Sequence, residues 1–580
     1  MGIITVIPKP HGPVTNRAPT RLLVIGLDGA TFDIIDPLIG RGELPAIKAL
    51  LERGVSCRLR STIPPFTLPA WTTFMTGVNP GKHGIFGFTQ QIEGTYKVVF
   101  VNSTFRLTPT FWQVLSGRGR KVCAMLFPGT YPPDPVNGIM ISGFDAPVTV
   151  GIDRTFYHPR ALYRELARTS GRLMIAEVQE TRINRDWHER AAASFPRTIE
   201  RKREAALHLL RKGSWDCFGV LFGEADTAAH HFWAYHDRAS PRFDASGAAR
   251  FGSVLEDVYK KLDEAVGALV DAAGPATPVM IASDHGFGGA GTGVLHLNRW
   301  LAGAGYLRFP VHRRGALAGF SRLIGPRLLP VRLQEAFFRT GSGRIANAIE
   351  SRWRQAKADW QGSMAYSDEE NYLPGIRINL KGREPEGIVP SDRYEELRKG
   401  LSTRLLDWKD PYTGRSVIKR VWNREDLYQG PGTGRAPDLI LEPALDDGYS
   451  YAVGSSHGPG PAVTRIPPAR HLGGKGSGMN GTHRRDGIML LAAPSLPAGR
   501  VDGYGLVDMA ATIYAILDEE PPAGLDGSPV KELFPDGEIP ERYRGIMPVL
   551  PEPGQPQPQP YSPAAAHELQ ERLRRLGYLE

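Results

Sequence analysis

Seven side chains that can bind cations or attack a phosphoryl group lie between residues 28 and 483 of this 580-residue chain. They comprise three carboxylates, three imidazoles and one hydroxyl, and each sits in a short motif. This donor set is typical of a hydrolytic site with two metal ions. The seven are Asp28 in VIGLDG, Thr67 in PPFTLPAW, Asp226 and His230 in GEADTAAHH, Asp284 and His285 in ASDHG, and His483 in NGTHRRDG.

Three of these motifs directly follow apolar runs that are typical of buried strands. Asp28 follows RLLVIGL, Asp226 follows CFGVLFG, and Asp284 follows PVMIAS. Ligands of open α/β sheets bind beyond the carboxyl ends of the strands, so we expect these residues at one sheet edge. Asp226 and His230 are four residues apart and share a face if their segment is helical. Carboxylates and imidazoles without a nearby thiolate suit Zn²⁺.

Thr67 is the candidate nucleophile. The sequence after it, LPAWTTFMTG, predicts a helix start, with Pro69 near the first helical position. A helix N-terminus offers unpaired N–H groups and partial positive charge to an anion. A hydroxyl needs activation by a base or a metal ion before it can attack. The reaction that fits is phosphoryl transfer through a covalent phospho-threonine intermediate.

Together the motifs resemble the type I phosphodiesterase/nucleotide pyrophosphatase branch of the alkaline phosphatase superfamily. The resemblance covers roughly residues 21–150, 214–300 and 365–540. It implies an alkaline-phosphatase-like α/β fold: a mostly parallel central sheet with helices on both faces and an inserted cap. It also implies two divalent cations, with Zn²⁺ expected and Mn²⁺ as the alternative. One would be held by Asp226, His230 and His483, and the other by Asp28, Asp284 and His285 beside Thr67.

One position departs from the pattern of that family. The nucleotide pyrophosphatases carry Asn three residues after the nucleophile, where its amide contacts a phosphoryl oxygen, whereas this chain has Ala70. Leu68 and Arg484 are the candidate substrate contacts. Leu68, Ala70 and Trp71 supply no charge for the third oxygen of a monoester dianion, which favours phosphodiesters as substrates.

Strand-like and helix-like segments alternate from Arg21 onward, a pattern typical of a parallel sheet covered on both faces. APDLILEP and DGIMLLAAP are expected strands that return to this core. A basic, apolar stretch after residue 310 is interpreted as part of the cap, with a membrane-surface segment as the alternative. We predict a flexible leader at 1–20, a first core part at 21–300, a cap at 301–425, a second core part at 426–545, a Pro/Gln-rich linker at 546–562 and an amphipathic C-terminal helix at 563–580.

Composition narrows the class of protein. The hydrophobic content of 41% and charged content of 23% are those of a globular protein, and no run reaches the roughly 18 apolar residues of a membrane helix. Three widely spaced cysteines indicate reduced thiols and a cytoplasmic location. The net charge of +9 allows a nucleic-acid partner. An arginine-rich surface is favoured because no nucleic-acid module is present, so the expected partner is a small phosphate ester. The sequence does not choose a partner for the C-terminal helix.

Several other functions compete with a phosphodiesterase. A sulfatase needs Cys or Ser in a C/S-x-P-x-R pattern, but here Thr67 begins the pattern and Trp71 replaces the arginine. A cofactor-independent phosphoglycerate mutase uses a Ser nucleophile and a larger insertion. The alternatives left open are a phosphomonoesterase or phosphomutase of the superfamily, and an inactive binding protein that keeps the fold.

Overall fold

The computed structural model describes residues 21–144, 152–175, 186–310, 358–472, 478–494, 496–534 and 536–543. The predicted leader, linker and C-terminal helix lie outside the described residues, as does the stretch 311–357 of the predicted cap.

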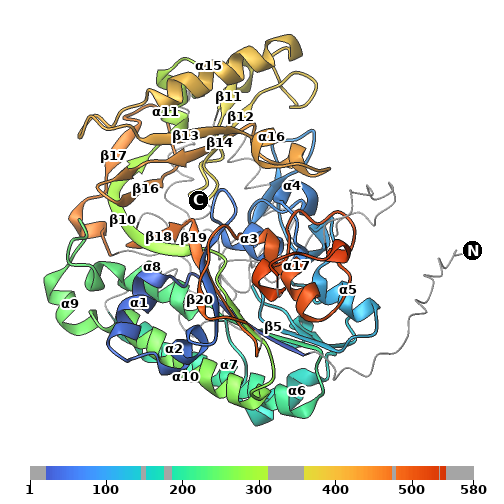
Figure 1. The fold of residues 1–580 in the computed structure, drawn as a ribbon. Coiled ribbons are helices and arrows are strands. Elements are labelled where there is room, and N and C mark those ends of the chain that lie inside the picture. The colour runs from blue at the N-terminus through green and yellow to red at the C-terminus, as the bar shows by residue number, and fades with distance from the viewer. Residues whose placement is uncertain are drawn as a thin grey trace, which may run out of the picture.

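A nine-stranded sheet forms the centre of the fold (Figure 1). The run β9-β1-β8-β5-β6 is parallel, while β19 and β7 pair antiparallel to their neighbours. The prediction of an α/β fold around a mostly parallel sheet is confirmed. In spatial order the strands are β20 (Gly499–Arg500), β2 (Gly54–Arg60), β19 (Asp486–Ala492), β9 (Val279–Ala282), β1 (Leu22–Leu27), β8 (Cys217–Phe222), β5 (Val122–Met125), β6 (Gly138–Ile141) and β7 (Tyr157–His158).

Helices cover both faces of this sheet (Figure 1). One group packs around α10: α1 (Phe32–Gly40), α2 (Pro45–Leu51), α7 (Trp187–Lys212), α8 (Glu224–His236) and α10 itself (Val254–Ala273). The other packs around α3: α3 (Thr67–Thr76), α4 (Pro80–His83), α5 (Phe111–Gly117) and α17 (Val507–Ile516).

The apolar patterns explain these positions. All six residues of β1 and of β8 are buried, as expected for strands covered on both faces. Helix α10 buries residues at helical spacing, among them Leu255, Val258, Leu262 and Leu269. It ends at Gly274, whose φ of 88° is a conformation that glycine adopts without strain.

A smaller four-stranded sheet lies above the central one in Figure 1. Its strands in order are β11 (Ala365–Tyr366), β12 (Gly375–Ile378), β14 (Leu439–Pro443) and β13 (Ile418–Asn423), and helices α11 (Leu297–Gly303) and α15 (Tyr394–Leu406) pack with it in a second apolar core. The expectation that APDLILEP returns to the central sheet is wrong, because β14 hydrogen-bonds to β12 and β13. Its apolar run, LIL, predicts a strand but does not specify which sheet that strand joins. The expectation for DGIMLLAAP is confirmed by β19.

Strand β10 (Gly286–Leu295) lies in a further, five-stranded sheet, separate from the central and the four-stranded sheets. It pairs with β18 (Gly481–Arg484) at its start and with β16 (Tyr449–Val453) and β17 (Val463–Arg465) further along. The remaining short elements are β3 (Thr89–Gln91), β4 (Val98–Phe100), α6 (Leu162–Thr169), α9 (Ala245–Phe251), α16 (Arg424–Leu427) and β15 (Leu445–Asp446).

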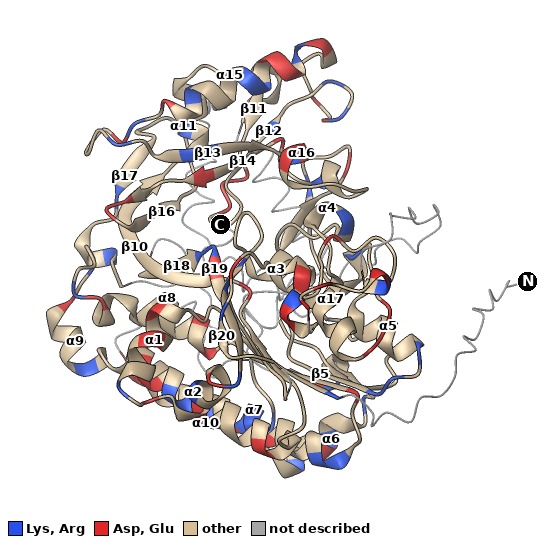
Figure 2. Ribbon diagram, viewed as in Figure 1, with Lys and Arg blue, Asp and Glu red and all other residues tan. Residues whose placement is uncertain are grey.

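Charges of both signs are interspersed on outer helices such as α7, α10 and α15 (Figure 2). This is the pattern of an ordinary solvated surface. Among the described residues, no helix combines the length and the apolar character needed to cross a membrane.

Candidate metal centre

Three of the predicted motifs meet at one edge of the central sheet. Asp28 follows β1, Asp284 follows β9 after Ser283, and α8 begins two residues after β8. These strands are parallel neighbours, so their carboxyl ends lie together. Asp226 and His230 occupy successive turns of α8 and therefore share a face of that helix.

His483 reaches the same edge from a distant part of the chain. It lies on β18, directly opposite Phe287 in the antiparallel pairing with β10. Gly481 permits this approach, because a Cβ atom there would lie 2.1 Å from the carbonyl oxygen of Ala229 in α8. The buried side chain of Asn480 strengthens the junction: its Oδ1 accepts from Ala234 N at 2.9 Å and its Nδ2 donates to His231 O at 2.9 Å.

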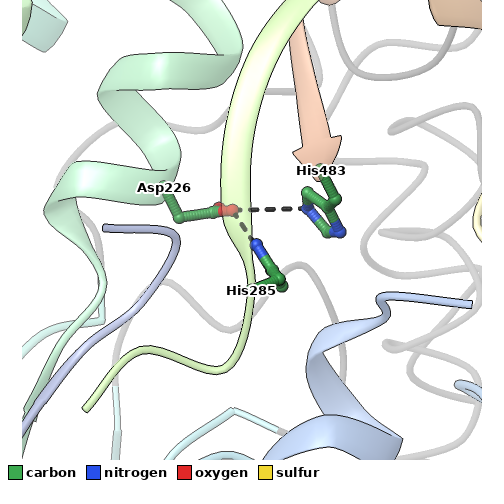
Figure 3. Close-up of side chains that lie close together, drawn as sticks. All are labelled: Asp226, His285 and His483. Carbon is green, nitrogen blue, oxygen red and sulfur yellow. Dashed lines mark ion pairs between the residues drawn. The ribbon is translucent and has the colours of Figure 1, made fainter. Parts of the chain in front are cut away.

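Asp226, His230 and His483 form a compact group of ligand atoms. Asp226 Oδ1 lies 3.3 Å from His230 Nε2 and 3.4 Å from His483 Nε2, and the two Nε2 atoms are 3.2 Å apart. His285 Nε2 lies 3.9 Å from the same Asp226 oxygen, so Asp226, His285 and His483 also converge (Figure 3).

Asp28, Asp284 and His285 form the neighbouring group. His285 Nε2 lies 3.3 Å from Asp284 Oδ2 and 3.7 Å from Asp28 Oδ1, and all three residues are buried. The hydroxyl of Thr67 lies 3.2 Å from the same His285 nitrogen. The structure thus brings together all seven residues that the sequence singled out.

Each of the three imidazoles has its Nδ1 atom beside a backbone carbonyl. Nδ1 of His230 donates to Gly481 O at 2.9 Å, Nδ1 of His285 to Gly286 O at 3.1 Å, and Nδ1 of His483 to Pro65 O at 3.0 Å. A carbonyl oxygen can only accept, so these contacts place the proton of the neutral ring on Nδ1 and the lone pair on Nε2. A hydrogen bond from Nδ1 to a carbonyl fixes the ring orientation in histidines that bind metal ions through Nε2.

The electrostatics of the two groups fit bound cations. Burial, and then the carboxylates of Asp28 and Asp226, hold the pKa of Asp284 well above its usual range. Burial also opposes ionisation of Asp226, but His230 and His483 hold its pKa well below the usual range. Burial, together with His483, holds the pKa of His285 well below the usual value, so that ring is neutral. Buried carboxylates crowded beside imidazole nitrogens are an environment in which a divalent cation is stabilised.

Helix α3 presents the Thr67 hydroxyl as predicted. The helix begins at Thr67, and its first turn contains Pro69, which has no N–H. The amide of Ala70 already donates to Phe66 O at 2.9 Å. The amides of Thr67 and Leu68 are therefore the first-turn donors left to meet an anion.

Leu68 and Arg484, the two candidate substrate contacts, lie in surroundings that the sequence did not predict. The Leu68 side chain is buried in an apolar cluster with Phe66 and Ile85, so only its backbone amide is positioned for a ligand. Arg484 donates to the carbonyls of Gly289 and Gly448, each at 2.9 Å, and to Ser450 Oγ. These hydrogen bonds hold its guanidinium against β10 and β16.

A pocket of about 640 Å³ opens beside His483. This size suits a small-molecule site. Its aromatic lining comes from both parts of the fold: Trp233, Phe287, Tyr372, Tyr449 and Tyr451. Sequence reasoning missed Tyr372, whose ring stacks on His483 with centroids 4.1 Å apart. No local pattern marks such a long-range contact.

Two further histidines lie close in sequence to the site but serve packing. His83 Nε2 contacts Thr73 Oγ1 at 3.0 Å, and its Nδ1 accepts from Ile85 N at 3.2 Å. The ring of His231 lies 4.6 Å from the ring of Trp187, on the side of α8 away from the ligand atoms.

Comparisons with known proteins agree with the motifs. The family model of type I phosphodiesterase / nucleotide pyrophosphatase matches residues 22–471, a range that contains six of the seven residues and ends before His483. No curated protein sequence matches the chain.

Two solved structures illustrate the structural similarity. An inactive murine ectonucleotide pyrophosphatase/phosphodiesterase 5 in complex with AMP is 12% identical, with a TM-score of 0.47, over 88% of this chain and 97% of the other. Phosphonoacetate hydrolase from Sinorhizobium meliloti 1021 in complex with phosphonoformate is 15% identical, with a TM-score of 0.47, over 86% of this chain and 95% of the other. The family match covers most of the chain, which therefore belongs to the type I phosphodiesterase/nucleotide pyrophosphatase family of phosphoric ester hydrolases.

Proposed function

We propose that this hydrolase cleaves phosphodiesters at a site for two divalent cations, with Thr67 as the nucleophile. Asp226, His230 and His483 would hold one cation, and Asp28, Asp284 and His285 the other. Zn²⁺ suits these nitrogen and oxygen donors, and Mn²⁺ is the alternative. The observation that carries the proposal is that the six ligand side chains form two adjoining groups, with the Thr67 hydroxyl 3.2 Å from His285 Nε2.

When bound, such cations supply positive charge that favours the ionised threonine and stabilises the phosphoryl oxygens. Thr67 Oγ1 would form a bond to phosphorus while the bond to the leaving alcohol oxygen breaks. The first-turn amides of α3 would donate to a phosphoryl oxygen. Water would then cleave the phospho-threonine ester and restore the hydroxyl.

The proposed preference for diesters rests on the residues that follow Thr67 in α3. Leu68, Ala70 and Trp71 are each at most 1% exposed and carry no charge. The guanidinium of Arg484 is engaged by Gly289, Gly448 and Ser450. A third phosphoryl oxygen that carries a neutral substituent suits this surrounding better than one that carries a second negative charge.

The test replaces Thr67 in the full chain and measures both turnover and adduct formation. Thr67→Ala should lower kcat for a p-nitrophenyl nucleotide diester by about 10³-fold or more, because the covalent route is lost. Thr67→Ser should retain a fraction of the activity. Mass spectrometry after an acid quench should find the nucleoside monophosphate esterified to residue 67 in the wild type and no such adduct in Thr67→Ala. Near-wild-type kcat in Thr67→Ala would refute the nucleophile assignment.

A further inference from the structure

Trp71 contacts the proposed metal centre through its indole nitrogen. Its Nε1 donates to Asp28 Oδ2 at 3.1 Å, and both side chains are almost fully buried. A hydrogen bond to an ionised carboxylate is stronger than one between neutral groups, and burial removes competition from water. We infer that Trp71 is a positioning residue. Its hydrogen bond to Oδ2 holds the Asp28 carboxylate in the orientation in which Oδ1 faces Asp284 and His285. This inference rests on the proposed two-cation site.

The geometry on the other side of the carboxylate supports this role. Asp28 Oδ1 lies 3.7 Å from His285 Nε2, whereas Oδ2 is the oxygen bonded to the indole. The two oxygens of Asp28 therefore face different groups. Rotation of the carboxylate would break the indole hydrogen bond and move Oδ1 away from the other ligand atoms.

Trp71 also links the nucleophile to this ligand. Thr67 and Trp71 are four residues apart in α3, so they lie on the same face of the helix. One rigid turn thus presents the Thr67 hydroxyl to His285 and the indole N–H to Asp28. The distance between the nucleophile and the proposed cation is set by this turn.

The indole ring is held in place on several sides. The rings of Phe74 and Phe127 contact it edge-on, with centroids 5.3 and 5.5 Å away. A Cβ atom at Gly26 would lie 2.9 Å from Trp71 Cη2. Gly26 of the VIGLDG motif therefore leaves room for the indole ring, which hydrogen-bonds to Asp28, two residues further along the chain.

A purely structural role for Trp71 is the competing explanation, and Trp112 provides a matched control. Trp112 is also fully buried in the same apolar core, with its ring centroid 5.6 Å from that of Phe127. Its indole nitrogen has no hydrogen-bond partner in the part of the chain that the structure describes. Trp71→Phe and Trp112→Phe remove the same group from the same core, but only the first removes a bond to Asp28.

The experiment measures metal affinity in the full chain. Wild type, Trp71→Phe and Trp112→Phe are stripped with a chelator and titrated with Zn²⁺ in competition with a chromophoric chelator. Trp71→Phe should weaken one of the two sites by about 10- to 100-fold, the cost typical of losing a hydrogen bond that orients a metal ligand, and leave the other within twofold. Excess Zn²⁺ should restore its kcat. Trp112→Phe should leave both affinities unchanged, even if both variants lose similar thermal stability.

A second variant separates the N–H group from ring packing. 3-Benzothienylalanine at position 71 has nearly the same shape as tryptophan but carries sulfur in place of the N–H, so it should reproduce the selective loss of affinity. Unchanged affinities in both position-71 variants, or equal weakening of both sites, would overturn the inference while leaving a two-ion wild type intact. A wild type that binds no Zn²⁺ would instead overturn the proposed function on which the inference rests.

Discussion

Nε2 of His230 lies 3.2 Å from Nε2 of His483, although 253 positions separate the two residues. Both Nδ1 atoms donate to backbone carbonyls, so the two Nε2 atoms are the ring nitrogens left to bind a ligand. A cation between them would take a lone pair from each ring. Asp226 Oδ1, 3.3 and 3.4 Å from the two nitrogens, supplies a third donor for the same cation.

The first prediction concerns metal content. Protein purified without chelator should contain two divalent ions per chain, mainly Zn²⁺, because the six ligands comprise carboxylates and imidazoles without thiolates. Elemental analysis measures the content, and dialysis against a chelator should abolish turnover. Less than one ion per chain, together with chelator-resistant activity, would contradict the two-cation site.

The second prediction separates the two ligand groups. His483→Ala should weaken the binding of one ion and Asp284→Asn the binding of the other. Each loss of affinity should exceed the roughly 10- to 100-fold that is typical of losing a hydrogen bond to a metal ligand. Added metal should rescue part of the activity, because occupancy depends on the free metal concentration. Metal titration of both variants provides the measurement. Asp33→Asn is the control, since Asp33 pairs with Arg58 at the pocket rim; normal affinities in all three variants would refute the ligand assignment.

The third prediction concerns the substrate class. kcat/KM should be higher for a p-nitrophenyl nucleotide diester than for p-nitrophenyl phosphate, because Leu68, Ala70 and Trp71 provide no charge for a dianion. Both substrates are compared at the same pH and metal concentration. A monoester preference of tenfold, about 1.4 kcal/mol of transition-state stabilisation, would assign the chain a monoesterase or mutase activity instead.

The fourth prediction concerns Asn480, which joins α8 to the strand of His483. Asn480→Ala should lower the free energy of unfolding by about 2–3 kcal/mol, because buried groups of Ala234 and His231 lose their partners. Urea denaturation measures this change. Asn480→Asp keeps the acceptor for Ala234 N but buries a carboxylate against His231 O, so it should be at least as destabilising as Asn480→Ala. No loss of stability in either variant would show that the junction is held by other contacts.

The fifth prediction concerns pH. Burial, with Arg106 nearby, lowers the pKa of His83 to about 3, whereas the unfolded chain has the ordinary value near 6.5. Between these values the unfolded state binds more protons, so the free energy of unfolding falls as the pH falls, by up to about 1.4 kcal/mol per pH unit from this group. His83→Gln should reduce the slope measured by urea denaturation between pH 5 and 6.5. Parallel slopes for the two proteins would rule out this contribution.

The sequence predicted the fold class and the seven converging residues because local signals mark them. An apolar run followed by Asp28 or Asp284 identifies a strand and its carboxyl end without knowledge of the other strands. The hydrogen bonds of Asn480 and Trp71 have no such signal, since their partners lie in distant segments. Strand β14 was assigned to the wrong sheet for a related reason, because its apolar run predicts a strand but not the strands with which it pairs.

Strand β10 has a consequence for how members of this family can exchange parts. It begins directly after His285, pairs with the strand of His483 at its start, and pairs with β16 and β17 further along. It lies in a five-stranded sheet separate from the central and the four-stranded sheets, so a recombination junction within β10 would interrupt these pairings. We therefore expect that the part of the fold that lines the pocket cannot be exchanged as a unit between relatives, and that new specificities arise by substitution of residues along the pocket wall.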